Sequence, residues 1–124
     1  MKQPVVTGGA GFIGSALVRA LLRSGASRVT VIDNLSLGKR SNLAEVASQV
    51  DLLEADICDY DSIAEAIAGA SVVYHLAAIP SVPKSIAEPV PSHRANIDGT
   101  FNVLLAAQRG GVRRLVYAAS SSAY

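Results

Sequence analysis

Apolar residues recur along the chain in five short runs, which longer amphipathic segments separate. Each run is nearly continuously apolar, instead of alternating with polar residues. Runs of this kind are typical of strands whose two faces are both covered by helices. The pattern predicts five buried strands, at residues 4–7, 28–33, 50–56, 71–78 and 112–120.

The segments between these runs carry helix signals, namely capping residues, apolar positions three or four apart, and closing glycines. They predict helices at residues 11–26, 41–49, 59–70 and 92–111, of which the last is the longest. Ser41 or Asn42 is expected to cap the second helix, and an Asp the third. Residues 79–91 hold four of the five prolines and predict a loop.

Strands and helices therefore alternate throughout. With right-handed crossovers, this order predicts an α/β fold, a Rossmann-type doubly wound parallel sheet with strand order 3-2-1-4-5. A length of 124 residues suits one domain, and no linker or internal repeat divides it.

Composition narrows the class of protein. The net charge of +1 and the absence of a basic block give nucleic-acid binding little electrostatic support. The single cysteine, Cys58, excludes an internal disulfide and is compatible with a reducing compartment. No apolar stretch is long enough to cross a bilayer, so we expect a cytoplasmic protein without a membrane partner.

Glycines crowd the junction of the first strand and first helix, at Gly8, Gly9, Gly11 and Gly14. Two spacings fit, one beginning at Gly8 and one at Gly9. In both, glycines permit a tight turn, close approach of a pyrophosphate to the backbone, and close packing of the helix on the sheet. The helix start also favours an anion. This pattern in this context predicts a dinucleotide site.

Asp33 ends the second predicted strand, about 20 residues beyond Gly14. Its carboxylate can accept hydrogen bonds from the adenosine ribose and would repel a 2′-phosphate, which favours NAD over NADP. The basic pair Lys39–Arg40 weakens that preference if it meets a phosphate. The alternative is a glycine turn without a ligand, with Asp33 as a helix cap.

Several motifs in order resemble the extended short-chain dehydrogenase/reductase family, and most closely the N-terminal portion of its NAD-dependent nucleotide-sugar 4-epimerases. They are "TGGAGFIGS", "DNLSLGKRSNL", "ADI", "HLAA", "NIDGT" and "VYAASSSAY". The resemblance covers the whole chain and implies NAD as cofactor. It implies cofactor contacts at Gly8, Gly11, Phe12, Ile13, Gly14, Asp33, Asn34, Ser36, Gly38, Asp56, Ile57, Leu76, Ala77, Ala78 and Asn96.

Some of these contacts have structural alternatives. Asp56 can accept the adenine amino group while Ile57 packs on the ring, but Asp56 can also serve as a charge at the next helix start. Small residues at 77 and 78 suit a passing cofactor or ordinary packing. A lone His75 within an apolar strand is more often a hydrogen-bonded core residue than a general base. For Asn96, structural support is favoured over direct ligand contact.

Serines end the fifth predicted strand, at the sheet edge where open α/β sheets bind ligands. The resemblance implies that Ser120 is the catalytic hydroxyl, with Ser121 and Ser122 as substrate contacts; a serine-rich turn is the alternative. Related sugar dehydratases carry an Asp-Glu pair after that hydroxyl. The pair Ser121–Ser122 therefore favours epimerisation, and the resemblance implies a UDP-hexose as substrate. The stretch "SVPKS" at residues 81–85 resembles the substrate loop of epimerases that act on a UDP-N-acetylhexosamine.

The resemblance also implies a Tyr-x-x-x-Lys base, which these 124 residues do not contain. We therefore expect an incomplete NAD-binding domain, ending before a sixth strand and the substrate domain, and inactive alone. An uncovered fifth strand would favour self-association. The alternatives are a non-catalytic dinucleotide-binding or folding module, and a fragment of a sugar-nucleotide dehydratase or reductase.

Overall fold

A five-stranded parallel sheet forms the centre of the computed structural model, which describes residues 3–77, 90 and 94–118. The strand order is β3-β2-β1-β4-β5, as the alternation of elements predicts. The strands are β1 (Val5–Thr7), β2 (Val29–Asp33), β3 (Val50–Glu54), β4 (Val73–His75) and β5 (Leu115–Tyr117). They are shorter than the apolar runs, because described residues at the ends of the runs, such as Pro4 and Ala55, lie outside the strands.

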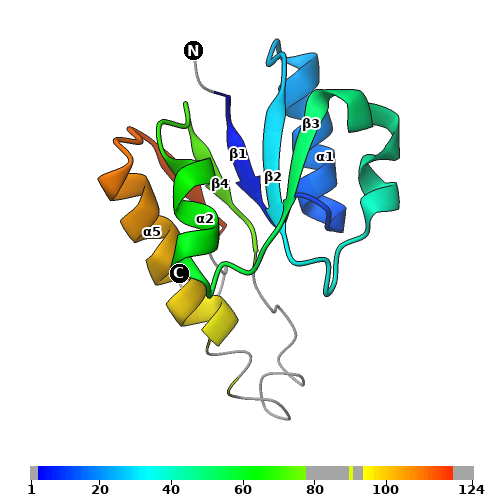
Figure 1. Cartoon of the computed structure of the whole chain (residues 1–124). Helices are drawn as coiled ribbons and strands as arrows, with labels where there is room; N and C mark the ends of the chain where they lie inside the picture. Colours follow the sequence, from blue (N-terminus) through cyan, green and yellow to red (C-terminus); the bar gives the residue numbers. More distant parts are fainter. Residues whose placement is uncertain (1–2, 78–89, 91–93, 119–124) are drawn as a thin grey trace, which may run out of the picture.

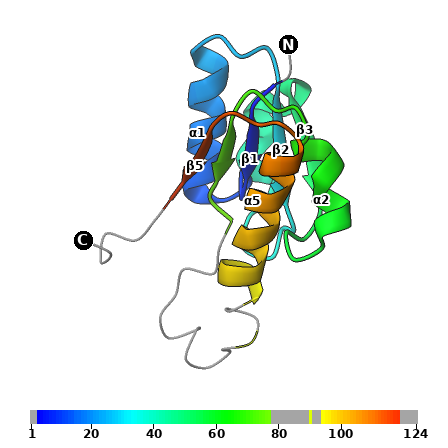
Figure 2. The same cartoon turned by 90° about the vertical axis from the view of Figure 1, so that its left-hand side faces the viewer.

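Helices cover both faces of the sheet (Figures 1 and 2). One face carries α1 (Phe12–Arg23) and the 3₁₀ segment η1 (Arg40–Gln49), and the other carries α2 (Tyr60–Ile67) and α5 (Gly99–Arg109). The π-helical segment η2 (Arg94–Asp98) leads directly into α5. The longest predicted helix is thus divided between two helix types.

Alternate residues of β1 point to two separate cores. Val5 packs with α2 and α5 through Ile63, Ile67 and Val103. Val6 instead joins Val18 and Leu43 beneath α1 and η1. Because successive side chains of a strand point to opposite faces, a nearly continuous apolar run supplies both cores.

One predicted helix cap differs from the structure, and the other has the predicted position without a capping bond. Lys39, and not Ser41 or Asn42, occupies the N-cap position of η1, and it makes no side-chain capping bond. The amide of Asn42 instead reaches back to the glycine loop, as described below. Asp59 does stand at the N-cap of α2, but its carboxylate accepts the Ser62 hydroxyl and no backbone N–H.

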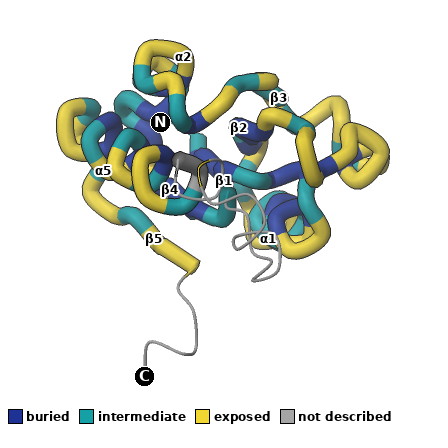
Figure 3. The backbone as a smooth tube through the Cα atoms, turned by 90° about the horizontal axis from the view of Figure 1, so that it is seen from below, coloured by how far each residue is buried: buried dark blue, intermediate teal, exposed yellow. Residues whose placement is uncertain are grey.

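The fifth strand lies at the sheet edge (Figure 3). It pairs with β4 on one side, and no other described residue pairs with it. Val116 and Tyr117 are 45% and 52% exposed. The described part of β5 is therefore the exposed apolar edge that the sequence predicts.

Candidate functional site

The glycine loop joins β1 to α1 at the carboxyl edge of the sheet. Gly8 has φ +73°, and an added Cβ would lie 2.8 Å from the Ala77 nitrogen. A Cβ on Gly14 would collide with the Gly8 carbonyl oxygen. A Cβ on Gly11 would lie 3.3 Å from the same oxygen, and apart from the chain neighbours of Gly11 no other described atom would lie within 4 Å of it. Two glycines thus allow close packing, whereas the third leaves the backbone accessible.

The first turn of α1 offers backbone donors beside this opening. Gly11 is the N-cap and supplies no side-chain cap. The N–H groups of Phe12, Ile13 and Gly14 make no hydrogen bond within the described residues. The Phe12 and Ile13 side chains are 90% and 70% exposed. Unpaired N–H groups at a helix N-terminus favour an anion, and they lie where the glycine spacing places a diphosphate.

Asp33 ends β2 and is only 8% exposed. Its Oδ2 accepts the N–H of Ala10 at 3.0 Å, and its Oδ1 accepts the N–H of Leu35 at 2.8 Å. A carboxylate has about four acceptor positions, so two remain for ribose hydroxyls. Asp33 is therefore both a candidate ligand and a structural acceptor for the glycine loop.

The segment after Asp33 folds back on the loop. The Oδ1 of Asn34 accepts the Ser36 N–H at 3.0 Å, which forms a local turn. A Cβ on Gly38 would lie 2.8 Å from both the Ala10 carbonyl carbon and Asp33 Oδ2. Gly38 thus allows this segment to pack against the site.

One basic residue of that segment, Arg40, already has an acidic partner. Arg40 forms an ion pair with Glu54 at 2.7 Å, with both side chains more than half exposed. Glu54 is the register partner of Asp33 on the neighbouring strand. The Arg40 guanidinium is therefore already matched by a carboxylate.

Asp56 and Ile57 follow β3 and differ in exposure. Asp56 is exposed, and its Oδ1 accepts the Cys58 N–H at 2.8 Å. Ile57 is 6% exposed and belongs to the core beneath α2 and α5. Its side chain therefore offers little apolar surface to an adenine ring, contrary to the packing expected from the sequence.

His75 lies at the end of β4 and is 1% exposed. Its Nδ1 lies 2.6 Å from Thr7 Oγ1, and its Nε2 lies 2.8 Å from Thr100 Oγ1. Its ring also stacks on Tyr117 with centroids 5.6 Å apart. Burial lowers the pKa of His75 to about 4, so the imidazole is neutral at pH 7.

The Thr7 hydroxyl determines the tautomer of His75. Its oxygen accepts the N–H groups of Leu76 and Ala77 at 3.0 and 3.1 Å, which use both lone pairs. Its O–H must therefore donate to Nδ1, and the ring proton is on Nε2, donated to Thr100. This Thr7–His75–Thr100 chain, the His75 bridge, joins the ends of β1 and β4 to the start of α5.

The residues beyond β4 are only partly described. Leu76 and Ala77 are half-buried beside the glycine loop. Asn96 lies in η2, on the approach to α5. Ala78, Ser120, Ser121 and Ser122 lie outside the described residues.

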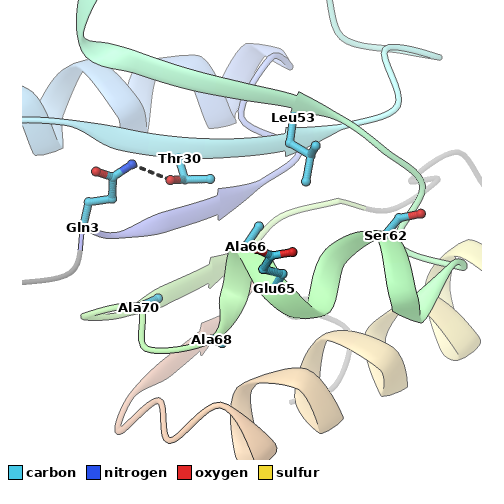
Figure 4. A pocket seen from close by; sticks show the side chains of 8 residues that line it. All are labelled: Gln3, Thr30, Leu53, Ser62, Glu65, Ala66, Ala68 and Ala70. Carbon is cyan, nitrogen blue, oxygen red and sulfur yellow. Dashed lines mark hydrogen bonds between the residues drawn. The ribbon is translucent and has the colours of Figure 1, made fainter.

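A separate groove of about 480 Å³ lies between α2 and the sheet (Figure 4). It contains none of the predicted site residues. The Nε2 of Gln3 donates to Thr30 Oγ1 at 2.6 Å and to Asp51 Oδ2 at 2.8 Å. The groove is lined by Gln3, Thr30, Leu53, Ser62, Glu65, Ala66, Ala68 and Ala70.

No group of three or more metal-ligating side chains occurs in the described residues.

The glycine loop, the unpaired N–H groups of α1 and Asp33 at the neighbouring strand end form a dinucleotide-type site. Residues 5–124 match the model of the NAD dependent epimerase/dehydratase family. The chain belongs to this family. Membership confirms the family and fold that the sequence motifs indicate.

Relatives within the family carry several activities. UDP-N-acetyl-alpha-D-glucosaminuronate decarboxylase of Bacillus cytotoxicus is 36% identical over 123 residues, which are 99% of this chain and 38% of the relative. The dTDP-glucose 4,6-dehydratase of Mycolicibacterium smegmatis is 40% identical over 111 residues, 88% of this chain and 34% of the relative. The chain thus spans between a third and two fifths of these proteins.

Among solved structures, the UDP-glucose 4-epimerase of Thermus thermophilus in complex with NAD superposes with a TM-score of 0.86. It is 38% identical, and the match covers 95% of this chain and 37% of that one. At this identity the likeness extends beyond the general fold to the family's N-terminal portion.

Sequence reasoning missed two residues that support the site. Thr100 lies inside the predicted helix of residues 92–111, without any signal that it meets His75. Asn42 reads as a helix cap, because Asn is common there. Only the packing of η1 against the glycine loop shows that its amide is directed to Ala10.

Proposed function

We propose that this chain is the NAD-binding part of a nucleotide-sugar 4-epimerase. The observation that carries the proposal is the set of unpaired N–H groups at Phe12, Ile13 and Gly14, with Asp33 at the neighbouring strand end. The donors suit a diphosphate, and the carboxylate suits an unphosphorylated ribose. The backbone around Gly11 is accessible to the diphosphate.

The residues divide by the part of the cofactor that they would hold. The diphosphate would lie on the loop and the α1 start, that is on Gly8, Gly11, Phe12, Ile13 and Gly14. The adenosine half would lie by Asp33, Asn34, Ser36 and Gly38. Asp56 and the backbone of Ile57 would lie beside its adenine ring. The nicotinamide half would pass Leu76, Ala77, Ala78 and Asn96.

NAD, when bound, supplies an acceptor and then a donor of hydride at the sugar's C4. The chain's own contribution is to bind and orient the cofactor, with Ser120 to Ser122 offering hydroxyls to a sugar. The pair Ser121–Ser122 supports epimerisation over the dehydration named for one relative. Because the 124 residues lack Tyr-x-x-x-Lys, we expect them to bind NAD without turning over a UDP-sugar.

Calorimetric titration with NAD and NADP tests the proposal. We expect saturable NAD binding, and NADP binding at least tenfold weaker, because Asp33 repels a 2′-phosphate. Asp33→Ala should weaken NAD binding at least tenfold and narrow the difference from NADP. Asp61→Ala, which removes an exposed carboxylate from α2, is the control and should change neither.

Failure to bind NAD, or a preference for NADP, would contradict the proposal. A non-catalytic dinucleotide-binding module remains the second candidate, supported by the cofactor site alone. A UDP-sugar that binds the NAD-loaded chain would favour the epimerase fragment over this module.

We further propose self-association through the exposed β5 edge, which presents Val116 and Tyr117. Sedimentation velocity should show a mass above the monomer at high concentration, and Val116→Lys should reduce it. A monomer at all concentrations would contradict this.

No helix among the described residues is both long enough and apolar enough for a bilayer. A cytoplasmic location is likewise a proposal, which rests on the sequence.

A further inference from the structure

One residue of the glycine loop, Ala10, is held by three contacts from outside the loop. The Ala10 N–H donates to Asp33 Oδ2 at 3.0 Å. The Ala10 carbonyl accepts the Lys39 N–H at 3.0 Å and the Asn42 Nδ2 amide at 2.8 Å. Ala10 itself is fully buried. We call this set of contacts, between Ala10 and Asp33, Lys39 and Asn42, the Ala10 clamp.

The clamp controls the direction in which the chain enters α1. The peptide between Ala10 and Gly11 is held at its carbonyl by residues 39 and 42 and at its N–H by the Gly8 carbonyl, 3.1 Å away. The preceding peptide is held by Asp33. Two consecutive peptide planes are thus oriented directly before the N-cap at Gly11, and they orient the N–H groups that follow.

Asn42 is the one member of the clamp with no other assigned role. Lys39 contributes only its backbone, which any residue except proline supplies, and Asp33 is a candidate ribose ligand. The Asn42 side chain bonds across 32 residues of sequence to the Ala10 carbonyl. Its own backbone is secured by the Lys39 carbonyl and by Arg19, so the amide is presented from a braced position.

We propose that Asn42 is a positioning residue for the diphosphate site, acting through the Ala10 carbonyl on the donors at the start of α1. The proposal rests on the proposed function, because it assumes that these donors meet a diphosphate. It predicts that loss of the Asn42 amide weakens ligands that carry a diphosphate and leaves adenosine binding unchanged.

The test uses the 124-residue chain with two variants. Asn42→Ala removes the donor, and Asn42→Asp replaces it by an acceptor of similar shape facing the carbonyl. Gln49→Glu, the same amide-to-carboxylate change at an exposed position of η1, is the control for charge. NAD and ADP are titrated by calorimetry, adenosine is titrated by NMR, and stability is followed by urea unfolding.

We expect Asn42→Ala to weaken NAD and ADP binding about threefold to tenfold, the range for one hydrogen bond when Lys39 still serves the carbonyl. Asn42→Asp should weaken them by at least tenfold, and Gln49→Glu by less than twofold. Adenosine affinity should change by less than twofold in every variant. If Asn42→Asp fails to fold, Asn42→Ala decides the matter alone.

Two results would overturn the proposal while leaving the proposed function intact. One is unchanged NAD binding by Asn42→Ala. The other is a loss of NAD and adenosine affinity in equal proportion, which indicates a general structural role. If the unaltered chain binds neither NAD nor ADP, the proposed function fails and this inference fails with it.

Discussion

The two buried hydrogen-bond clusters at the carboxyl edge hold the glycine loop in different ways. The Ala10 clamp grips the loop before α1, and its members reach the surface, where Asn42 is exposed. The His75 bridge bonds to Thr7 at the other end of the loop, and His75 is 1% exposed. The comparison separates a cluster beside the proposed diphosphate site from one that joins β1, β4 and α5.

Removal of the Thr7 hydroxyl should have the largest effect, because this group bonds His75 and two backbone N–H groups at once. Thr7→Val is nearly isosteric but leaves the Ala77 N–H and His75 Nδ1 without their partner. Each buried group left unsatisfied costs about 1–3 kcal/mol, so we expect the free energy of unfolding to fall by about 4 kcal/mol. Urea unfolding measures this. Thr7→Ser should recover most of the loss, and an equal loss in both variants would disprove the assignment.

Two glycines separate packing from ligand access. Gly14→Ala forces its Cβ against the Gly8 carbonyl, so we expect the free energy of unfolding to fall by about 2–3 kcal/mol. We also expect this variant to lose NAD binding. Gly11→Ala meets only one atom at 3.3 Å, so it should cost about 1 kcal/mol or less and still abolish tight NAD binding. Urea unfolding and calorimetry distinguish the two. Equal NAD affinity in Gly11→Ala and the unaltered chain would contradict the role of Gly11.

The bridge should also be sensitive to pH. The unfolded chain binds a proton on His75 near pH 6.5, whereas the folded chain binds it only near pH 4. The stability from neutral His75 is therefore complete above pH 6.5 and is lost as the pH falls toward 4. With about 1.4 kcal/mol for each pKa unit, the loss reaches about 2 kcal/mol at pH 5.

Comparison with His75→Gln isolates this contribution from the carboxylates that titrate in the same range. We expect the difference in unfolding free energy between the two proteins to shrink by about 2 kcal/mol between pH 7 and pH 5. A difference that stays constant with pH would show that His75 does not resist protonation.

The smallest effect concerns the exposed ion pair between Arg40 and Glu54. Glu54→Gln releases Arg40 beside the Asp33 strand end, and we expect NADP affinity to rise by about twofold to fivefold, the range for an exposed ion pair. NAD affinity should not change, and added salt should remove the gain. The measurement is calorimetry at two salt concentrations. Unchanged NADP affinity at low salt would mean that Arg40 does not reach the phosphate.

The sequence predicts the layers and the strand order because continuous apolar runs and amphipathic helices report burial directly. Val5 and Val6 serve two different cores, and the run "PVVT" already indicates this. The glycine spacing likewise predicts close packing at Gly14, where an added Cβ would meet the Gly8 carbonyl.

The remaining features depend on contacts between distant residues. The amide of Asn42 reads as a helix cap until η1 packs on Ala10. The side chain of Ile57 turns into the core, because α2 and α5 leave an apolar space there. The hydrogen bonds of the buried His75 ring are made with Thr7 and Thr100, which lie 68 and 25 residues away. Local patterns carry no record of such pairings.

The central claim is that the N–H groups at the start of α1 receive a diphosphate beside Asp33. Amide NMR spectra of the chain titrated with NAD test this directly. The account predicts saturable shifts at Phe12, Ile13 and Gly14, with Asp33 and Ala10 following at the same midpoint. Shifts confined to other residues, such as those lining the groove by Gln3 and Glu65, would contradict it.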